Sequence, residues 1–423
     1  MRATLTLSPR RLRQLWYAPL LAIAMGLMML RMLVMARLFD VRAFAEFSGG
    51  ILVSSTFCML GCLGLQAMLQ REWPVNLVRK QELRALVRVA QCCIVAVGCC
   101  VVGLMAAAQG LSLAGMAPAL LAVGMLHGLS QQCFLLATVE SRSRGDALRF
   151  ANQNLLRAVV AMGLSVTVAL YSGSALWALA SDALATILMS LGFFRRSLRH
   201  VNLGATAVGA LAMRRMKRVQ WRSAFTLMVI MIVGFALLNV DRWIASDLLG
   251  VTGFAHYSFV WIVLSIAQST QAVINASVYP LVARRFAEHG RAVAFHVCLR
   301  ASIAILVIGS AAAVPLGYLL GYGVRRWYPQ FDDAIVLLPL FLGIGVLRVS
   351  DFWSSFLLIT GLEERLLRVN VAAALTGALA WALVVRPWSG EAIAAAQVGW
   401  LAALLTLSAY AATAAVSLRA RRV

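Results

Sequence analysis

Two copies of one short pattern decide the fold: ARLFDVRAFAEFS (36–48) and SDLLGVTGFAHYS (246–258), offset by 210 residues in a chain of 423. Five positions are identical: Leu38/Leu248, Val41/Val251, Phe44/Phe254, Ala45/Ala255 and Ser48/Ser258. Three more are similar: Phe39/Leu249, Ala43/Gly253 and Phe47/Tyr257. Because the offset is close to half the chain length, the pattern predicts two halves of the same architecture.

The composition outside these copies indicates a membrane protein. Apolar residues make up 62% of the chain and charged residues 13%, against about 45–50% and about 25% in soluble domains. A membrane span uses about 20 apolar residues, so this chain has material for about a dozen spans. The composition excludes a soluble enzyme, a single-span receptor with a large polar domain, and a disordered chain.

Apolar runs long enough to span a bilayer number twelve. They lie near 15–38, 46–68, 88–108, 115–138, 150–172, 174–194, 223–246, 254–278, 300–322, 334–358, 366–386 and 392–417. With the N-terminus cytoplasmic, 29 of the 38 Lys and Arg residues fall on the cytoplasmic side, 5 on the opposite side and 4 within spans. Basic residues favour the cytoplasmic loops, so both termini are expected in the cytoplasm.

The predicted fold class is an all-α polytopic membrane protein, with twelve transmembrane helices in two six-helix bundles related by a parallel repeat. The expected parts are an N-terminal bundle (1–194), a basic cytoplasmic connector (195–222) and a C-terminal bundle (223–423). Six spans per half give both halves the same orientation, which is a transporter architecture. The connector segment LAMRRMKR (211–218) is expected to form a short surface helix.

The net charge of +22 follows from basic loops between apolar runs. That pattern indicates membrane topology and contact with anionic membrane lipid, and we expect no nucleic-acid partner. All eight cysteines lie within or at the edge of apolar runs without a C-x-x-C spacing. They are read as small apolar fillers, and no metal site or cofactor is expected.

Three stretches of the chain resemble a known family. They are MARLFDVRAFAEFSGGILVSSTFCMLGCLGLQAML (35–69), LLNVDRWIASDLLGVTGFAHYSFVWIVLSIAQSTQAVINASVYPLVARRF (237–286) and YPQFDDAIVLLPLFLGIGVLRVSDFWSSFLLITGLEERLLRVN (328–370). The Asp241-Arg242 pair, a Leu-Gly turn and Phe-x-x-Tyr are similar to bacterial oligosaccharide-lipid flippases. These form the polysaccharide-transport family of the multidrug/oligosaccharidyl-lipid/polysaccharide exporter superfamily.

The resemblance implies a function and a place. The substrate would be an oligosaccharide on a polyprenyl diphosphate, moved by alternating access from the cytoplasmic to the outer leaflet of the bacterial inner membrane. Its product would serve O-antigen (lipopolysaccharide) or exopolysaccharide biosynthesis, with other polysaccharide-assembly membrane proteins as further partners. A protein is required because unpaired polar groups cost several kcal/mol each in hydrocarbon.

Ionisable residues within spans are the candidate cavity residues. Arg31 and Asp241 are 210 residues apart and opposite in charge, so one hypothesis is a gate in which they face each other and substrate phosphate competes for Arg31. The alternative is that each side chain reaches the outer interface. Arg242 is a further in-span charge next to Asp241.

The fifth span carries a polar face. Gln153, Asn154 and Arg157 are spaced to share one side of a helix. The favoured interpretation is a cavity-lining Arg157 that binds diphosphate, since arginine binds phosphate through two parallel hydrogen bonds. The alternative pairs Arg157 with Asp182 or with a backbone carbonyl. Asp182 is either a protonation site for ion-coupled transport or a partner for an arginine.

The remaining candidates lie in the fourth, eighth and tenth spans. Arg348 and Asp351 are three residues apart and are expected to pair along one helix. The glutamines Gln131, Gln132, Gln268 and Gln271 are expected to bind sugar hydroxyls or, alternatively, neighbouring helices.

Three other functions compete with the flippase. An enzyme, such as a polysaccharide polymerase or ligase, is not expected because the predicted outer loops are short and motifs such as H-E-x-x-H and G-x-S-x-G are absent. A cation-coupled multidrug exporter of the same superfamily would share the fold but prefer an acidic cavity. A sugar-uptake permease is disfavoured because QREWPVNLVRKQEL (70–83) lacks its acidic-basic loop signature.

Overall fold

The computed structural model describes residues 16–110, 116–144, 146–201, 204–385, 387 and 391–419. The predicted cytoplasmic arginines Arg2, Arg10, Arg11, Arg13, Arg421 and Arg422 lie outside the described residues, as does Arg386 on the predicted outer side.

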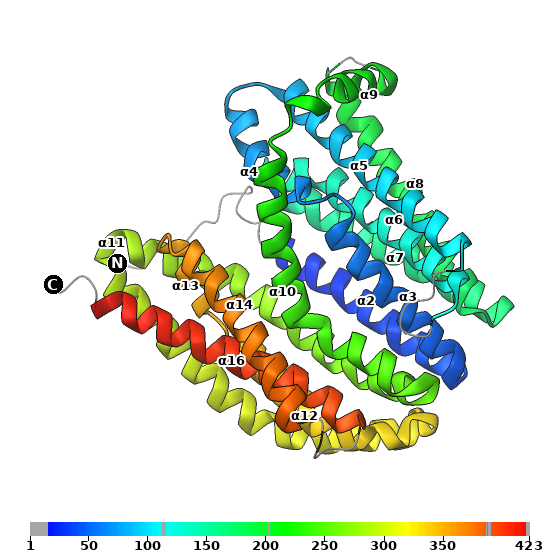
Figure 1. Ribbon diagram of the computed structural model, residues 1–423, viewed down its shortest axis with the longest axis vertical. Coiled ribbons are helices and arrows are strands. Elements are labelled where there is room, and N and C mark those ends of the chain that lie inside the picture. Colours follow the sequence, from blue (N-terminus) through cyan, green and yellow to red (C-terminus); the bar gives the residue numbers. More distant parts are fainter. Residues whose placement is uncertain are drawn as a thin grey trace, which may run out of the picture. The chain divides into compact units, whose positions relative to one another are not determined.

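The described chain is helical almost throughout and holds no β-strand, as predicted (Figure 1). The first eight α-helices are α2 (Tyr17–Leu38), α3 (Val41–Leu60), α4 (Leu65–Val78), α5 (Glu82–Ala108), α6 (Pro118–Ser143), α7 (Ala147–Ser172), α8 (Ala175–Val201) and α9 (Ala205–Arg214). The later ones are α10 (Trp221–Leu248), α11 (Gly250–Trp327), α12 (Leu338–Val349), α13 (Trp353–Ile359), α14 (Glu363–Ala380) and α16 (Glu391–Arg419). Short turns of other helix types are η1 (Met216–Arg218), η2 (Pro329–Leu337) and η3 (Trp381–Val385).

Twelve segments of the described chain are long and apolar enough to cross a bilayer, which confirms the predicted count. Two of the predicted runs are interrupted. The run 46–68 ends as a helix at Leu60, and α4 starts separately at Leu65. The run 334–358 is divided between α12 and α13 by a break at 350–352. In α11 the long helix is kinked at Gly290, whose backbone has a φ of 79°.

The repeated pattern forms the same turn in both halves. Helix α2 ends at Leu38 and α10 ends at Leu248, 210 residues later. The turns are closed by different chemistry. In the first, the Asp40 carboxylate accepts the backbone N–H of Ala43 at 2.7 Å, which is the usual N-cap of a helix start. In the second, Gly250 takes a left-handed φ of 61°, which glycine adopts without strain.

The chain divides into two compact units. One comprises Met1–Phe39 with Glu46–Ile232, and the other comprises Asp40–Ala45 with Val233–Val423. The division within α10 assigns the connector and the start of that helix to the first unit. The expected domain limits of 1–194, 195–222 and 223–423 stay a prediction. In the connector, α9 and η1 supply the helical structure expected around 211–218.

Within the first unit, α3 and α6 pack closely because α6 presents glycines. A Cβ on Gly128 would lie 2.7 Å from the Ser54 carbonyl oxygen, and one on Gly124 would lie 2.9 Å from Val53 Cβ. Real Cβ atoms are not found at such distances, so only glycine permits this approach. The close contact brings α6 side chains next to Ser54, which matters for the site below.

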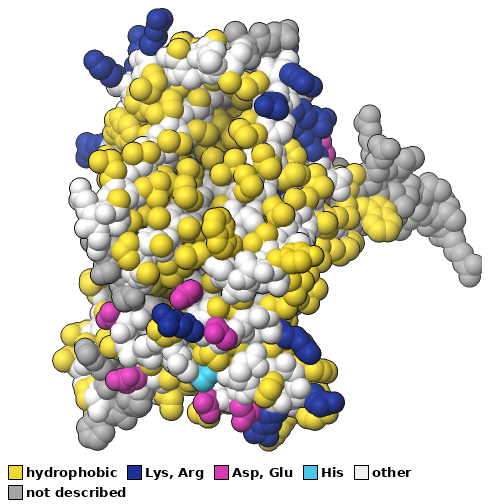
Figure 2. Space-filling view, turned by 90° about the vertical axis from the view of Figure 1, so that its right-hand side faces the viewer, with side chains coloured by type: hydrophobic (Ala, Val, Ile, Leu, Met, Phe, Trp, Pro, Cys, Tyr) yellow, Lys and Arg dark blue, Asp and Glu magenta, His cyan; other side chains and the backbone are white. Residues whose placement is uncertain are grey.

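The surface is strongly apolar. Figure 2 shows many hydrophobic side chains on the surface of the molecule. Large hydrophobic side chains such as Val102 (68% exposed) and Leu170 (63% exposed) lie mostly uncovered on this surface. Exposed apolar area on this scale fits contact with lipid.

The α3–α6 approach gives a stability prediction. Gly128→Ala is expected to destabilise the folded protein by about 1–3 kcal/mol, because the added methyl group overpacks against backbone. Gly163→Ala in α7 is the matched control, since nothing lies within 4 Å of a Cβ there. The melting temperature of each purified variant measures the effect. Equal melting temperatures for both variants would contradict the close packing.

Candidate functional site

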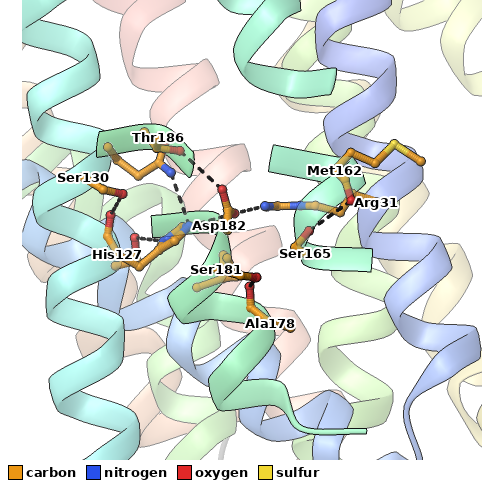
Figure 3. A network of polar contacts seen from close by, with 12 residues as sticks. Arg31, His127, Ser130, Met162, Ser165, Ala178, Ser181, Asp182 and Thr186 are labelled. Carbon is orange, nitrogen blue, oxygen red and sulfur yellow. Dashed lines mark hydrogen bonds and ion pairs between the residues drawn. The ribbon is translucent and has the colours of Figure 1, made fainter. Parts of the chain in front are cut away.

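The buried polar centre of the first unit is a salt bridge between Arg31 of α2 and Asp182 of α8 (Figure 3). Arg31 Nη1 donates to Asp182 Oδ2, and both side chains are buried. Thr186, one turn further along α8, has its hydroxyl 3.4 Å from Asp182 Oδ1. The guanidinium also lies 5.9 Å from the Phe47 ring centre. Opposite charges therefore compensate each other inside an apolar body, where an unpaired charge is costly.

His127 of α6 joins the same carboxylate. Its Nε2 lies 2.9 Å from Asp182 Oδ2, and its Nδ1 lies 2.7 Å from the Ser54 hydroxyl. Since a carboxylate accepts, Nε2 is the nitrogen that donates to Asp182. Asp182 thus connects α2, α6 and α8, and the close α3–α6 packing supplies the serine.

These contacts change the expected roles of the charged residues. Arg31 forms a salt bridge with Asp182. Asp241 accepts a hydrogen bond from the Tyr257 hydroxyl at 2.9 Å. Each of the two groups expected to form an Arg31–Asp241 gate therefore has a partner within its own unit. Asp182 is the partner of an arginine, as one of its two expected roles had it, and that arginine is Arg31 and not Arg157.

Arg157 of α7 differs from Arg31 in that its hydrogen-bond partner is a neutral amide. Its Nη2 donates to the Gln131 side-chain oxygen, and its guanidinium lies 4.6 Å from the Phe134 ring centre. Its Nε is buried and without a hydrogen-bond partner among the described residues. No ion pair of the described chain involves Arg157. The two groups that it contacts, the Gln131 amide and the Phe134 ring, are uncharged. The side chain is half-buried and so keeps some access.

The other polar residues of that α7 face have local partners. Gln153 is buried and accepts the Ser141 hydroxyl at 2.6 Å. Asn154 donates to the Phe150 carbonyl one turn earlier at 2.8 Å. Gln131 lies between the two polar groups, since its side-chain nitrogen is 3.3 Å from His127 Nε2 and its oxygen accepts from Arg157. Gln132 points elsewhere, with its amide 2.7 Å from the Gln66 side-chain oxygen.

In the second unit, Asp241 and Arg242 of α10 are both buried. Asp241 Oδ2 accepts the Tyr257 hydroxyl, while Oδ1 has no hydrogen-bond partner among the described residues. A Cβ on Gly399 of α16 would come within 3.2 Å of Asp241 Oδ2, so α16 passes close to this carboxylate. Arg242 lies over the Trp261 ring, 4.2 Å from its centre, in a cation–π contact.

The expected pairing of Arg348 with Asp351 is wrong. Helix α12 ends at Val349, so the two side chains do not follow one helix face. Arg348 donates to the backbone carbonyls of Leu238 and Leu237 at 3.2 and 3.3 Å. Asp351 instead accepts backbone N–H groups of Trp353 and Ser354 at 3.1 and 3.2 Å. Asp351 precedes the N-cap residue Phe352, and its carboxylate accepts the first two backbone N–H groups of α13.

A small cavity of about 260 Å³ lies beside these residues in the second unit. Its polar lining comprises Gln271, Arg348, Asp351, Thr406 and Tyr410. The amide of Gln271 lies 3.5 Å from the Asp351 carbonyl oxygen. Gln268 is half-buried on α11. The cavity gathers three residues that the sequence identified separately.

His127 is the main residue that the sequence did not identify. Its position four residues before Gln131 in an apolar run was the available signal, because residues at this spacing share a helix face. No group of three metal-binding side chains occurs in the part of the chain that the structure describes.

Known proteins resemble the chain in structure and not in sequence. No protein-family model matches it, and no curated protein sequence matches it either. The lipid II flippase MurJ, in an inward closed conformation, gives a TM-score of 0.65 at 10% identity over 93% of this chain and 87% of that one. An inward-facing multidrug resistance MATE family transporter of the MOP superfamily gives 0.60 at 13% identity over 96% and 94%.

A third structure, of a MOP superfamily transporter from Pyrococcus furiosus, gives a TM-score of 0.60 at 15% identity over 97% of this chain and 95% of that one. Its binding pocket is described as having reversed polarity. At these identities the likeness establishes the fold: the chain has the twelve-helix architecture of these MOP superfamily structures.

The buried ion pair gives a second prediction. Asp182→Ala leaves the Arg31 guanidinium buried without a carboxylate and is expected to cost about 3–5 kcal/mol of stability. The double variant Arg31→Met, Asp182→Leu is expected to recover most of that loss, because apolar groups of similar size replace both charges. Melting temperature and the yield of monodisperse protein report on both. A double variant no more stable than Asp182→Ala would refute the pairing.

Proposed function

We propose that the protein is a MOP superfamily transporter that moves a polyprenyl-diphosphate-linked oligosaccharide from the cytoplasmic to the outer leaflet of the bacterial inner membrane, for surface polysaccharide synthesis. The fold supports a transporter, and one fold neighbour is a lipid flippase. Fold alone does not choose a substrate, so the choice rests on the charges inside the spans.

Arg157 is the observation that carries the proposal. Of the interior charges of the first unit, Arg31 is compensated by Asp182, and Arg157 has only the Gln131 amide and the Phe134 ring. In the second unit, two arginines (Arg242, Arg348) and two aspartates (Asp241, Asp351) balance in number. Among the seven in-span charges that the sequence identifies, four arginines outnumber three aspartates. Of the two arginines among them that belong to the first unit, Arg157 is the one that has no acidic partner among the described residues.

An uncompensated cation at membrane depth is expensive, so it is expected where function needs it. A diphosphate supplies the missing charge and several acceptor oxygens, which suit the planar fork of an arginine. Gln131 can donate or accept towards sugar hydroxyls beside it. The prenyl tail would stay in the bilayer while the polar head passes.

A multidrug exporter is the second candidate, and Asp241 favours it. The Oδ1 atom of this buried carboxylate has no hydrogen-bond partner among the described residues, and a cationic drug could supply one. MATE exporters share the fold equally well. The two proposals differ in which charge the substrate must meet: Arg157 for the lipid diphosphate and Asp241 for the organic cation.

The substrate prediction is tested in a strain that lacks the gene. The deletion strain is expected to accumulate lipid-linked glycan on the cytoplasmic leaflet and to lack surface polysaccharide. The wild-type gene should restore the surface polysaccharide. Arg157→Ala is expected to reduce restoration at least tenfold at normal protein level, because the phosphate contact is lost. Arg300→Ala, which removes an exposed arginine of α11, is the control and should restore fully.

Two outcomes would contradict the flippase. Full restoration by Arg157→Ala would remove the assigned role of this residue. Unchanged surface polysaccharide together with increased sensitivity to cationic dyes, complemented by wild type and not by Asp241→Asn, would establish the exporter instead.

A further inference from the structure

Four arginines from separate segments of the first unit line one pocket. The residues of this arginine pocket are Gln81, Arg84, Val87, Arg88, Gln91, Arg215 and Arg218. Gln81 precedes α5, and the next four lie in the first three turns of this helix. Arg215 precedes η1 in the connector, and Arg218 belongs to it. The pocket has a volume of about 350 Å³, which is that of roughly a dozen water molecules at about 30 Å³ each.

The walls of the pocket are fixed by packing and hydrogen bonds. Gln91 is buried, and its amide nitrogen donates to the Ala212 carbonyl of α9 at 3.3 Å. Arg88 Nη1 donates to the Gln91 oxygen at 3.0 Å, so Gln91 joins α5 to the connector. Val208 and Ala212 of α9 pack into the same buried cluster as α5. Arginines of both segments therefore line one hollow whose backbone is held by these contacts.

The charge of the pocket is largely uncompensated. Arg88 pairs with Glu72 at 3.1 Å. No ion pair of the described residues involves Arg84, Arg215 or Arg218. Glu82, the other carboxylate at the start of α5, is bound to Arg144 at 2.9 Å. Of the four arginines that line the pocket, one has an acidic partner, Glu72, and that residue is not part of the lining. The mutual repulsion of these arginines is relieved by an anion that accepts several hydrogen bonds, and phosphate is the group that arginine binds best.

The surroundings of the pocket place it at a membrane surface. Val78, at the end of α4, is 86% exposed, and Met213, at the end of α9, is 60% exposed. Beside them Arg84, Arg215 and Arg218 are exposed as well. Exposed apolar side chains next to exposed arginines are typical of segments that lie in the headgroup region of a bilayer. The phosphate nearest to such a pocket is that of a lipid.

We propose that the arginine pocket binds the phosphate headgroup of an anionic phospholipid at the end of the bilayer where α5 begins, the predicted cytoplasmic side. The bound phosphate bridges the arginines of α5 and those of the connector and so fastens the connector to the first unit. The site differs from a diffuse attraction between basic loops and the membrane, because it has walls and converging donors. It does not depend on the proposed flippase activity.

The test uses the purified full-length chain in detergent and measures its melting temperature as phosphatidylglycerol, phosphatidylcholine or inorganic diphosphate is added. Phosphatidylglycerol is expected to raise the melting temperature of the wild type in a saturable way, and phosphatidylcholine is not. Arg215→Ser/Arg218→Ser is expected to weaken the phosphatidylglycerol effect about tenfold or more, since each basic group near the surface contributes about 1 kcal/mol.

The matched control is Arg195→Ser/Arg199→Ser, which removes the same charge from two exposed arginines of α8 outside the pocket. Its phosphatidylglycerol response should equal that of the wild type. Arg84→Ser, on α5, is the second pocket variant and should weaken the response on its own. Both pocket variants change exposed side chains, so their melting temperatures without lipid should stay near the wild-type value.

Two results would overturn the proposal. An equal loss of the phosphatidylglycerol effect in the pocket variant and the α8 control would show general electrostatic attraction without a site. Stabilisation by inorganic diphosphate that depends on the pocket arginines, with no effect of phosphatidylglycerol, would assign the site to a free phosphate compound.

Discussion

Charges inside an apolar helical body must be compensated, and the Arg31–Asp182 pair is where the first unit meets this requirement most fully. The carboxylate receives a guanidinium from α2 and an imidazole from α6 while belonging to α8. A water-soluble protein could leave such groups at its surface, but a chain whose surface faces lipid must place them inside. The Asp182 carboxylate therefore connects α8 to α2 through Arg31 and to α6 through His127.

The other interior arginines show different solutions to the same problem. Arg348 satisfies its donors with two backbone carbonyls of α10, and Arg242 lies over an indole ring. Arg157 has only a neutral amide and a phenyl ring. The chain compensates Arg31 with an aspartate from another helix, whereas the contacts of Arg157 are neutral. This contrast is the basis on which we propose that Arg157 meets an anionic ligand. In the arginine pocket three arginines likewise lack an acidic partner among the described residues, and we propose that a lipid phosphate compensates them.

The sequence was sufficient to predict the twelve membrane spans, but it did not predict which charged side chains pair with each other. Composition and run length predicted twelve spans, because the bilayer sets the length of an apolar helix. The 210-residue offset predicted the turn after Leu38 and its counterpart after Leu248. The partner of Arg31 was missed because an offset within the sequence does not reveal which helices pack. Arg348 and Asp351 were paired wrongly because the break near Ser350 lies in an apolar run with no strong helix breaker. His127 was missed although it lies four residues before Gln131, because that spacing does not reveal the carboxylate on another helix that it meets.

The central claim is that an anionic lipid-linked head, met by Arg157, crosses the membrane through this protein. Transfer of a short-chain polyprenyl-diphosphate oligosaccharide across the bilayer of proteoliposomes measures it most directly, with accessibility of the sugar to an external lectin as the readout. The account predicts transfer with the wild-type protein, at least tenfold slower transfer with Arg157→Ala, and no competition by an organic cation. Transfer equal in protein-free liposomes and proteoliposomes, alongside uptake of a cationic dye by the same proteoliposomes, would contradict it.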